Sequence, residues 1–294
     1  MLAEARQFVN WVRRTNPASH TWKDYCSDLK FFAAAVGDRP LKQITFHEVD
    51  AFVIQQCERG FKPKTVNRRL TTIAAMYEYF SPEDESLVCP VYYGRHHRRE
   101  PKRLPRPVPI DDLRRFFAAI PTLPDNIEAV RDRAMFSLML RDGLRIGEVA
   151  ALRLNDLFLK EELPRMVVNG KGSKQRPAYL ASQALRALRD YLALRPRCKD
   201  NHVFLTYRLN GLSTHAIHMR LDHYRKLAGV NFTCHQLRHS FATDLNEADM
   251  PITSIQALMG HQWIETTMLY VQANDKKVQS DFLAASQKLE GWSA

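Results

Sequence analysis

Residues 235–243 of the chain read HQLRHSFAT, residues 258–261 read LMGH, and Tyr270 follows nine residues later. His235 and Arg238 are three residues apart, so on a helix both side chains lie on one face and can contact the same anion. Arginine offers a planar fork of donors to two phosphate oxygens, and histidine donates hydrogen bonds or moves protons near neutral pH. A tyrosine becomes a nucleophile when nearby cations stabilise its oxyanion. The pattern therefore predicts a phosphate site.

Tyrosine attack on a phosphodiester conserves the bond energy in a phosphotyrosine ester, so a cut strand can be rejoined without ATP. Taken alone, the pattern also fits a plainer interpretation. A single His-x-x-Arg pair is common on solvated helix surfaces, and a lone tyrosine is usually a half-buried aromatic side chain. Two motifs earlier in the chain favour catalysis.

Residues 140–149, which read LRDGLRIGEV, contain the first of these motifs. Gly143 ends one predicted helix and Arg145 opens the next. Arg145 is therefore expected near a helix N-terminus, where anions bind favourably. The structural alternative for this arginine is a salt bridge to Glu148, one helical turn later.

Residues 167–176, which read VVNGKGSKQR, contain the second motif. They are predicted to form a strand, a glycine-rich turn and a second strand. Lys171 lies between two glycines at the tip, where an ammonium group can reach a leaving oxygen and protonate it. A lone basic hairpin tip is usually only solvated surface, but the fixed order of the motifs along the chain supports a catalytic role.

Together these motifs resemble the active-site set of the tyrosine recombinases, the family of the phage integrases and the Xer-type enzymes. The resemblance covers nearly the whole chain and shows no departure at a catalytic position. It implies cleavage and rejoining of DNA strands with no cofactor and no metal. The implied roles are Tyr270 as nucleophile, Arg145 and Arg238 as phosphate clamps, Lys171 as general acid for the 5′-hydroxyl, His235 as proton acceptor or donor, and His261 as hydrogen-bond donor to the transition state.

Apolar residues recur at helical spacing through residues 2–14, 19–36, 45–59 and 64–80, with short links between the helices. Thr45 and Glu48 form a predicted capping box for the third helix. This pattern predicts a small helical bundle. We therefore expect a DNA-binding domain at residues 1–88, and the family resemblance implies a core-binding bundle of the SAM-like type.

The fourth predicted helix begins with polar, mostly cationic residues, which we expect to contact bases and phosphates of DNA. The alternative is an ordinary solvated helix end. These residues are Lys62, Lys64, Asn67, Arg68 and Arg69. The residues around the hairpin tip are also expected to contact DNA, namely Lys174 and Arg176.

Residues 89–109 are rich in proline, which excludes a continuous helix, and rich in positive charge. We expect an extended basic linker that lies along the DNA backbone. Its predicted contacts are Arg98, Arg99, Lys102 and Arg103. His96 and His97 are adjacent, but no cysteine or carboxylate at metal-ligand spacing accompanies them.

Residues 110–294 form the predicted catalytic domain, with helices near 110–120, 126–141, 182–194, 213–228 and 252–259. Three short strands between 157 and 180 predict a small sheet, so the fold class is mainly α with a small β-sheet (α+β). After Tyr270, apolar residues recur at helical spacing at Val278, Phe282, Ala285 and Leu289. The resemblance implies that this C-terminal helix docks into a neighbouring protomer, whereas packing on its own domain is the alternative.

The chain has 294 residues, 45% of them hydrophobic, and a formal net charge of +11. This charge predicts a polyanionic partner, although a ribosomal or membrane-surface protein would show it too. An odd number of cysteines without a Cys-x-x-Cys motif indicates reduced thiols. Without a signal peptide or a membrane-length apolar run, the chain is expected in the cytoplasm, associated with the nucleoid.

The leading hypothesis is a site-specific recombinase that acts on double-stranded DNA as a homotetramer, alone or with a partner recombinase, through a Holliday junction. Integration, excision and resolution of DNA elements all remain open. A type IB topoisomerase uses the same chemistry, but the small N-terminal bundle and the apolar C-terminal stripe argue against it. A non-catalytic DNA-binding protein would lack a catalytic residue, and none is missing.

Overall fold

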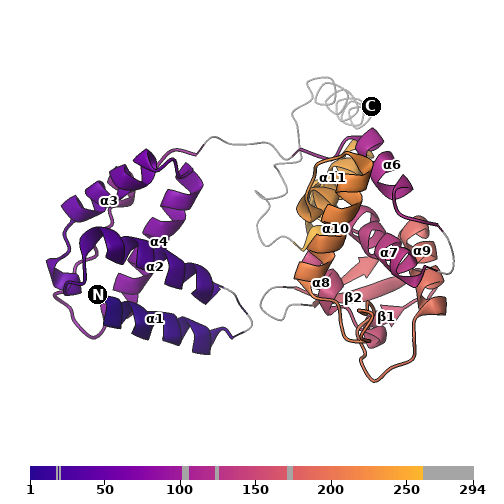
Figure 1. Cartoon of the computed structure of the whole chain (residues 1–294), viewed down its shortest axis with the longest axis horizontal. Helices are drawn as coiled ribbons and strands as arrows, with labels where there is room; N and C mark the ends of the chain where they lie inside the picture. Colours follow the sequence, from indigo (N-terminus) through magenta and orange to yellow (C-terminus); the bar gives the residue numbers. More distant parts are fainter. Residues whose placement is uncertain (18, 20, 101–105, 123–125, 171–174, 261–294) are drawn as a thin grey trace, which may run out of the picture. The chain divides into compact units, whose positions relative to one another are not determined.

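The computed structural model describes residues 1–17, 19, 21–100, 106–122, 126–170 and 175–260. The chain divides into two compact units, Met1–Lys102 and Arg103–Ala294, and each has its own hydrophobic core (Figure 1). Both are mainly helical, and the second contains a small sheet, as the sequence predicted. Within the described ranges no helix is long and apolar enough to span a membrane.

The first unit is the predicted helical bundle. Its elements are α1 (Leu2–Thr15), α2 (Thr21–Val36), a 3₁₀ turn (Leu41–Gln43), α3 (Phe46–Glu58), α4 (Pro63–Phe80) and the short α5 (Tyr93–His96). The predicted capping box of α3 is present, because the Thr45 hydroxyl accepts from the His47 amide and the Glu48 carboxylate accepts from the Thr45 amide. Helix α4 begins with a proline at its first turn, where no backbone N–H is needed.

The segment after α4 packs back onto the bundle. The buried Asn67 side chain donates to the Arg98 carbonyl and accepts from the Arg98 amide, both at 2.8 Å. Val91 is buried in the same core, and Arg95 forms an ion pair with Asp50 at 2.6 Å. Much of the predicted linker 89–109 therefore belongs to the first unit. Near its other end, Val108 is buried in the core of the second unit.

The second unit is built around α7 (Ile127–Arg141), whose side chains are buried on several faces. Helix α9 (Ser182–Leu194) packs on one side of it and α11 (Cys234–Glu247) on another (Figure 1). The remaining helices are α6 (Ile110–Ala118), α8 (Ile146–Ala151), α10 (Thr214–Ala228) and α12 (Ile252–Met259), with a 3₁₀ turn at Leu154–Asp156.

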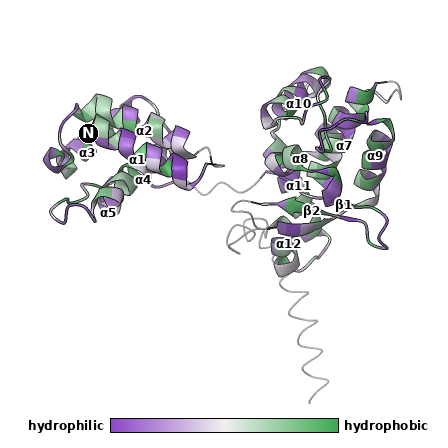
Figure 2. Cartoon of the chain, turned by 90° about the horizontal axis from the view of Figure 1, so that it is seen from below, coloured by the Kyte–Doolittle hydropathy of each residue, from purple (hydrophilic) through white to green (hydrophobic). Residues whose placement is uncertain are grey.

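The sheet is antiparallel in the order β1 (Leu157–Phe158), β2 (Arg165–Asn169) and β3 (Gln175–Tyr179). Asn169 pairs with Gln175 and Val168 with Arg176, so residues 170–174 join β2 to β3. Lys171 belongs to this connection and lies outside the described residues. Helix α12 contacts β3 and α11, and Figure 2 shows it below α11.

The joint between α7 and α8 depends on Gly143. Its φ of +65° lies in the left-handed region, which glycine adopts without strain. The ring of Phe241, on α11, packs so closely that a Cβ at position 143 would overlap it. The next residues, Leu144 and Arg145, therefore leave α7 in a fixed direction, which brings Arg145 to the start of α8.

We predict that Gly143→Ala destabilises the second unit by about 2–4 kcal/mol. An alanine would be strained at this left-handed φ, and its Cβ would also overlap the Phe241 ring. Gly147→Ala is the matched control, since this glycine is exposed, helical and has nothing within 4 Å of an added Cβ. The control should be neutral or stabilising by about 0.5–1 kcal/mol. Denaturant unfolding of both variants checks this, and equal stability would contradict the role given to Gly143.

Candidate active site

Helix α11 places His235 and Arg238 at its first turns. Thr233 caps the helix, with its hydroxyl accepting from the Gln236 amide at 3.3 Å and the Gln236 side chain returning to the Thr233 amide. His235 is exposed at this end, whereas Arg238 is 1% exposed. The Arg238 guanidinium donates to the carbonyl oxygens of Gly143 and Met259, so it joins the ends of α7 and α12.

Arg145 is the N-cap residue of α8. Its amide donates to Glu148 Oε2 at 2.8 Å, and its guanidinium Nη1 donates to Glu148 Oε1 at 2.9 Å. The salt bridge that the sequence offered as a structural alternative is therefore present. It also holds the guanidinium at the helix N-terminus, where the unpaired amide groups favour an anion.

Glu148 is the carboxylate around which the site arginines gather. Its side chain is 3% exposed, and it lies 2.9 Å from Arg145, 2.9 Å from Arg176 and 3.9 Å from Arg238. One negative charge faces three guanidinium groups, so the cluster has an excess of positive charge. The sequence suggested Glu148 only as a partner of Arg145, because the other two arginines reach it from distant segments.

The C-terminal end of α12 meets the same cluster. Gly260 has a left-handed φ of +59° and ends the helix. Arg145 Nη2 lies 3.4 Å from the Gly260 carbonyl oxygen, and Arg238 donates to the Met259 carbonyl. Carbonyl oxygens at a helix C-terminus carry partial negative charge and favour cations. His261 is the next residue and lies, with Tyr270, outside the described part of the chain.

His239, which the sequence did not single out as a site residue, packs against His235. The centroids of the two imidazole rings are 4.2 Å apart, at an interplanar angle of 71°. Burial, together with the neighbouring charges of His235 and Arg238, lowers the pKa of His239 to about 4. His239 is therefore neutral at pH 7. His235 and His239 are four residues apart on a helix, and this spacing could have predicted their contact.

Two residues of α4 that were predicted to contact DNA are instead buried, and this is a correction. Asn67 is 6% exposed, and its side chain forms hydrogen bonds with the backbone of Arg98. Arg69 is 3% exposed, and its guanidinium lies 4.0 Å from the centroid of the Phe31 ring and 4.1 Å from that of Phe61. It donates to Gln56, so its donors serve the interior of the bundle.

The other nine predicted DNA contacts lie in different environments. Arg68 is exposed but forms an ion pair with the buried Asp28 at 2.7 Å. Four more are exposed, namely Lys62, Lys64, Arg98 and Arg99. Three lie outside the described residues, namely Lys102, Arg103 and Lys174. The last, Arg176, is mostly buried at Glu148.

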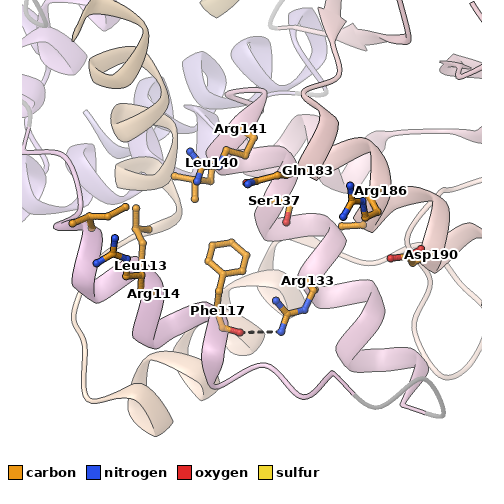
Figure 3. Close-up of a pocket in the computed structure, with 12 residues that line it drawn as sticks. Leu113, Arg114, Phe117, Arg133, Ser137, Leu140, Arg141, Gln183, Arg186 and Asp190 are labelled. Atoms are coloured by element: carbon orange, nitrogen blue, oxygen red, sulfur yellow. Dashed lines mark hydrogen bonds between the residues drawn. The ribbon is translucent and has the colours of Figure 1, made fainter. Parts of the chain in front are cut away.

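A hollow of about 390 Å³ lies elsewhere in the second unit, between α6, α7 and α9 (Figure 3). Leu113 and Phe117 border it together with Arg133, which donates to the Phe117 carbonyl at 2.9 Å. None of the predicted site residues lines it. Among the residues that the structure describes, no cluster of histidine, cysteine or carboxylate side chains is arranged to hold a metal ion.

Comparisons with known proteins agree with this architecture. The phage integrase family model matches residues 108–277, and the model of the phage integrase N-terminal SAM-like domain matches residues 5–83. The tyrosine recombinase XerC of Staphylococcus carnosus is 28% identical over 91% of each chain. XerC of Alcanivorax borkumensis is 30% identical over 88% of this chain and 84% of its own.

Solved structures share the fold at lower identity. The XerH recombinase in a post-cleavage complex with palindromic difH substrate has a TM-score of 0.77 at 18% identity, over 94% of this chain and 83% of its own. The Tn1549 transposon integrase in complex with transposon right end DNA has a TM-score of 0.76 at 16% identity, over 96% of this chain and 99% of its own. The fold and sequence matches define a site-specific recombination enzyme. The chain belongs to the phage integrase family and is a Xer-like tyrosine recombinase.

We predict that Glu148→Gln lowers the free energy of unfolding of the second unit by about 2–4 kcal/mol, because buried guanidinium groups lose their counter-charge. Glu161→Gln is the control, since Glu161 pairs with Arg165 at 2.8 Å on the exposed surface. It should cost less than about 1 kcal/mol. Denaturant unfolding measures both, and a Glu148 variant as stable as the control would show that the arginines do not depend on this carboxylate.

Proposed function

We propose that the chain cleaves and rejoins DNA strands at a specific recombination site through a 3′-phosphotyrosine intermediate on Tyr270. The observation that carries this proposal is the convergence of Arg145 and Arg238 on Glu148 and on the end of α12. The end of α12, which the two arginines contact, directly precedes His261 in the chain. This cluster of positive charge suits a phosphodiester better than a neutral or cationic ligand.

In the proposed reaction the Tyr270 oxygen attacks the scissile phosphorus, and the bond from phosphorus to the 5′-oxygen breaks. The leaving oxygen takes a proton from Lys171 and becomes a 5′-hydroxyl. Arg145 and Arg238 bind the non-bridging oxygens and stabilise the charge that develops on them. His235 accepts the tyrosine proton, and His261 donates a hydrogen bond to the transition state. Attack by a 5′-hydroxyl on the phosphotyrosine reverses the steps and rejoins a strand, without cofactor or metal.

Arg238 is 1% exposed in the DNA-free chain, so the proposed mechanism includes an opening step at the site. Binding of the scissile phosphate would then replace protein contacts of Arg145 and Arg238 with contacts to its oxygens. Because the site would be completed only on its recombination site, the free enzyme would not cleave nonspecific DNA.

DNA binding in this proposal involves both units. In the first unit we assign phosphate contacts to exposed cations at the start of α4 and after α5, namely Lys62, Lys64, Arg98 and Arg99. The net charge of +11 supports this assignment. Similar solved structures include DNA complexes, among them XerH bound to difH substrate and a lambda integrase dimer bound to a core site. We assign catalysis to the domain that begins near residue 110.

Strand exchange requires more than one active site. We propose that a tetramer on two recombination sites, with the C-terminal helix docked in a neighbouring protomer, cuts strands in pairs and passes through a Holliday junction. A second recombinase could supply half of the protomers. The reaction would take place in the cytoplasm at the nucleoid. The similarity to site-specific recombinases favours this activity over the topoisomerase alternative.

Covalent trapping tests the proposed chemistry. The full chain is incubated in EDTA with nicked duplexes from its own genetic neighbourhood, and denaturing gels reveal protein–DNA adducts. We expect an adduct with the wild-type chain and none with Tyr270→Phe, which should still bind DNA, because only Tyr270 supplies the attacking oxygen.

Tyr207→Phe is the matched control, since Tyr207 is an exposed tyrosine of the same unit, and it should form the adduct as the wild type does. An adduct that persists in Tyr270→Phe would place the nucleophile elsewhere. Tight DNA binding without any adduct in the wild type would support a non-catalytic protein or one that needs a partner.

A further inference from the structure

We propose that Arg176 is a positioning residue, which fixes the base of the β2–β3 hairpin against α8 and α12 and thereby aligns Lys171 with the phosphate clamp. This inference rests on the proposed function, because it takes Lys171 as the general acid. It replaces the sequence-based expectation that Arg176 contacts DNA.

The first contact ties β3 to α8. Arg176 Nη2 donates to Glu148 Oε2 at 2.9 Å, while Glu148 Oε1 accepts from Arg145 Nη1 at the same distance. The two oxygens of one carboxylate thus hold two arginines from separate segments. Because Glu148 lies on α8, any shift of β3 along this helix stretches the ion pair.

The second contact ties β3 to the end of α12. A Cβ added at Gly260 would lie 2.7 Å from Arg176 Cδ and 2.8 Å from Arg176 Nε. The arginine side chain therefore crosses directly over the Gly260 backbone, in space that only a glycine leaves open. Since Gly260 precedes His261, Arg176 packs at the entrance to the segment that carries the remaining proposed catalytic residues.

The burial and the contacts of Arg176 support a positioning role. Its side chain is 12% exposed, and its Nε and Nη1 atoms are shielded from solvent and have no hydrogen-bond partner among the described residues. Burial lowers the pKa of the guanidinium, which Glu148 opposes and Arg145 reinforces. The remaining nitrogen, Nη2, donates to Glu148, so the guanidinium of Arg176 is directed at the protein. The side chain thus serves contacts inside the protein.

The register of the hairpin connects this anchor to Lys171. Arg176 pairs with Val168, and the adjoining pair, Asn169 with Gln175, is the last before the connection that contains Lys171. A hairpin anchored this close to its turn transmits little motion from the rest of the strand. Without the anchor, the ammonium group would sample positions away from the leaving oxygen, and misplacement by about 1 Å can cost about 10²-fold in rate.

The experiment compares leaving groups on the duplex that forms the adduct with the wild-type chain. The scissile phosphate carries either the natural 5′-oxygen or a 5′-bridging sulfur, and single-turnover cleavage is measured. In both cases the Tyr270–phosphorus bond forms and the bond to the bridging atom breaks. Sulfur leaves as a thiolate with its electron pair and needs no proton, whereas oxygen leaves efficiently only when Lys171 protonates it.

Arg176→Met keeps much of the side-chain stem and removes the guanidinium. We expect it to slow cleavage of the oxygen substrate by about 100-fold and to cleave the sulfur substrate within about tenfold of wild type, as Lys171→Ala should. Arg145→Ala should be slow on both substrates. Arg165→Met, on the neighbouring strand and paired with Glu161 at the surface, should behave as wild type on both.

Two results would overturn the inference. Equal slowing of Arg176→Met on both substrates would mean that Arg176 acts on the phosphate and not through Lys171, and a wild-type rate on the oxygen substrate would mean that it does not act at all. Hydrogen exchange of the DNA-free chain tests the anchor even if no duplex is cleaved. Amides of residues 165–169 and 175–179 should exchange at least about tenfold faster in Arg176→Met, and unchanged exchange would contradict the anchor.

Discussion

The active site depends on one buried carboxylate. Glu148 lies within reach of Arg145, Arg176 and Arg238, which come from the start of α8, from β3 and from α11. Guanidinium groups held this close repel one another, and their burial costs solvation free energy. The carboxylate compensates part of both costs but leaves an excess of positive charge. That remaining charge makes the cluster a place for a phosphate, so stability and chemistry rest on the same ion pairs.

Backbone geometry supplies the second constraint, because two glycines let the arginines reach their carbonyl partners. Gly143 turns the chain at the end of α7 beneath the Phe241 ring, and its carbonyl accepts from Arg238. Gly260 ends α12 and leaves space for the Arg176 side chain. Both have positive φ, which a larger residue would adopt only with strain. The positions of these turns set where the guanidinium groups can lie.

Local sequence features predicted most of the helices and strands, since capping residues and apolar periodicity act over a few residues. The Thr45–Glu48 capping box and the helix end at Gly143 are examples. Burial of cationic and polar residues was not predicted, because it depends on segments distant in sequence. Asn67 is covered by the backbone near Arg98, and Arg69 by two phenylalanine rings. The roles of Lys171, His261 and Tyr270 stay predictions, since these residues lie outside the described part of the structure.

A double-mutant cycle tests most directly whether Glu148 and the arginines act as one unit. Single-turnover cleavage would be measured for the wild type, Glu148→Gln, Arg176→Met and the double variant, on one duplex and under conditions where all are folded. If the carboxylate acts through the arginine, the double variant should be no more than about threefold slower than the slower single variant. A double variant slowed by the product of the two single effects would show that the residues act independently, and it would contradict the central role of Glu148.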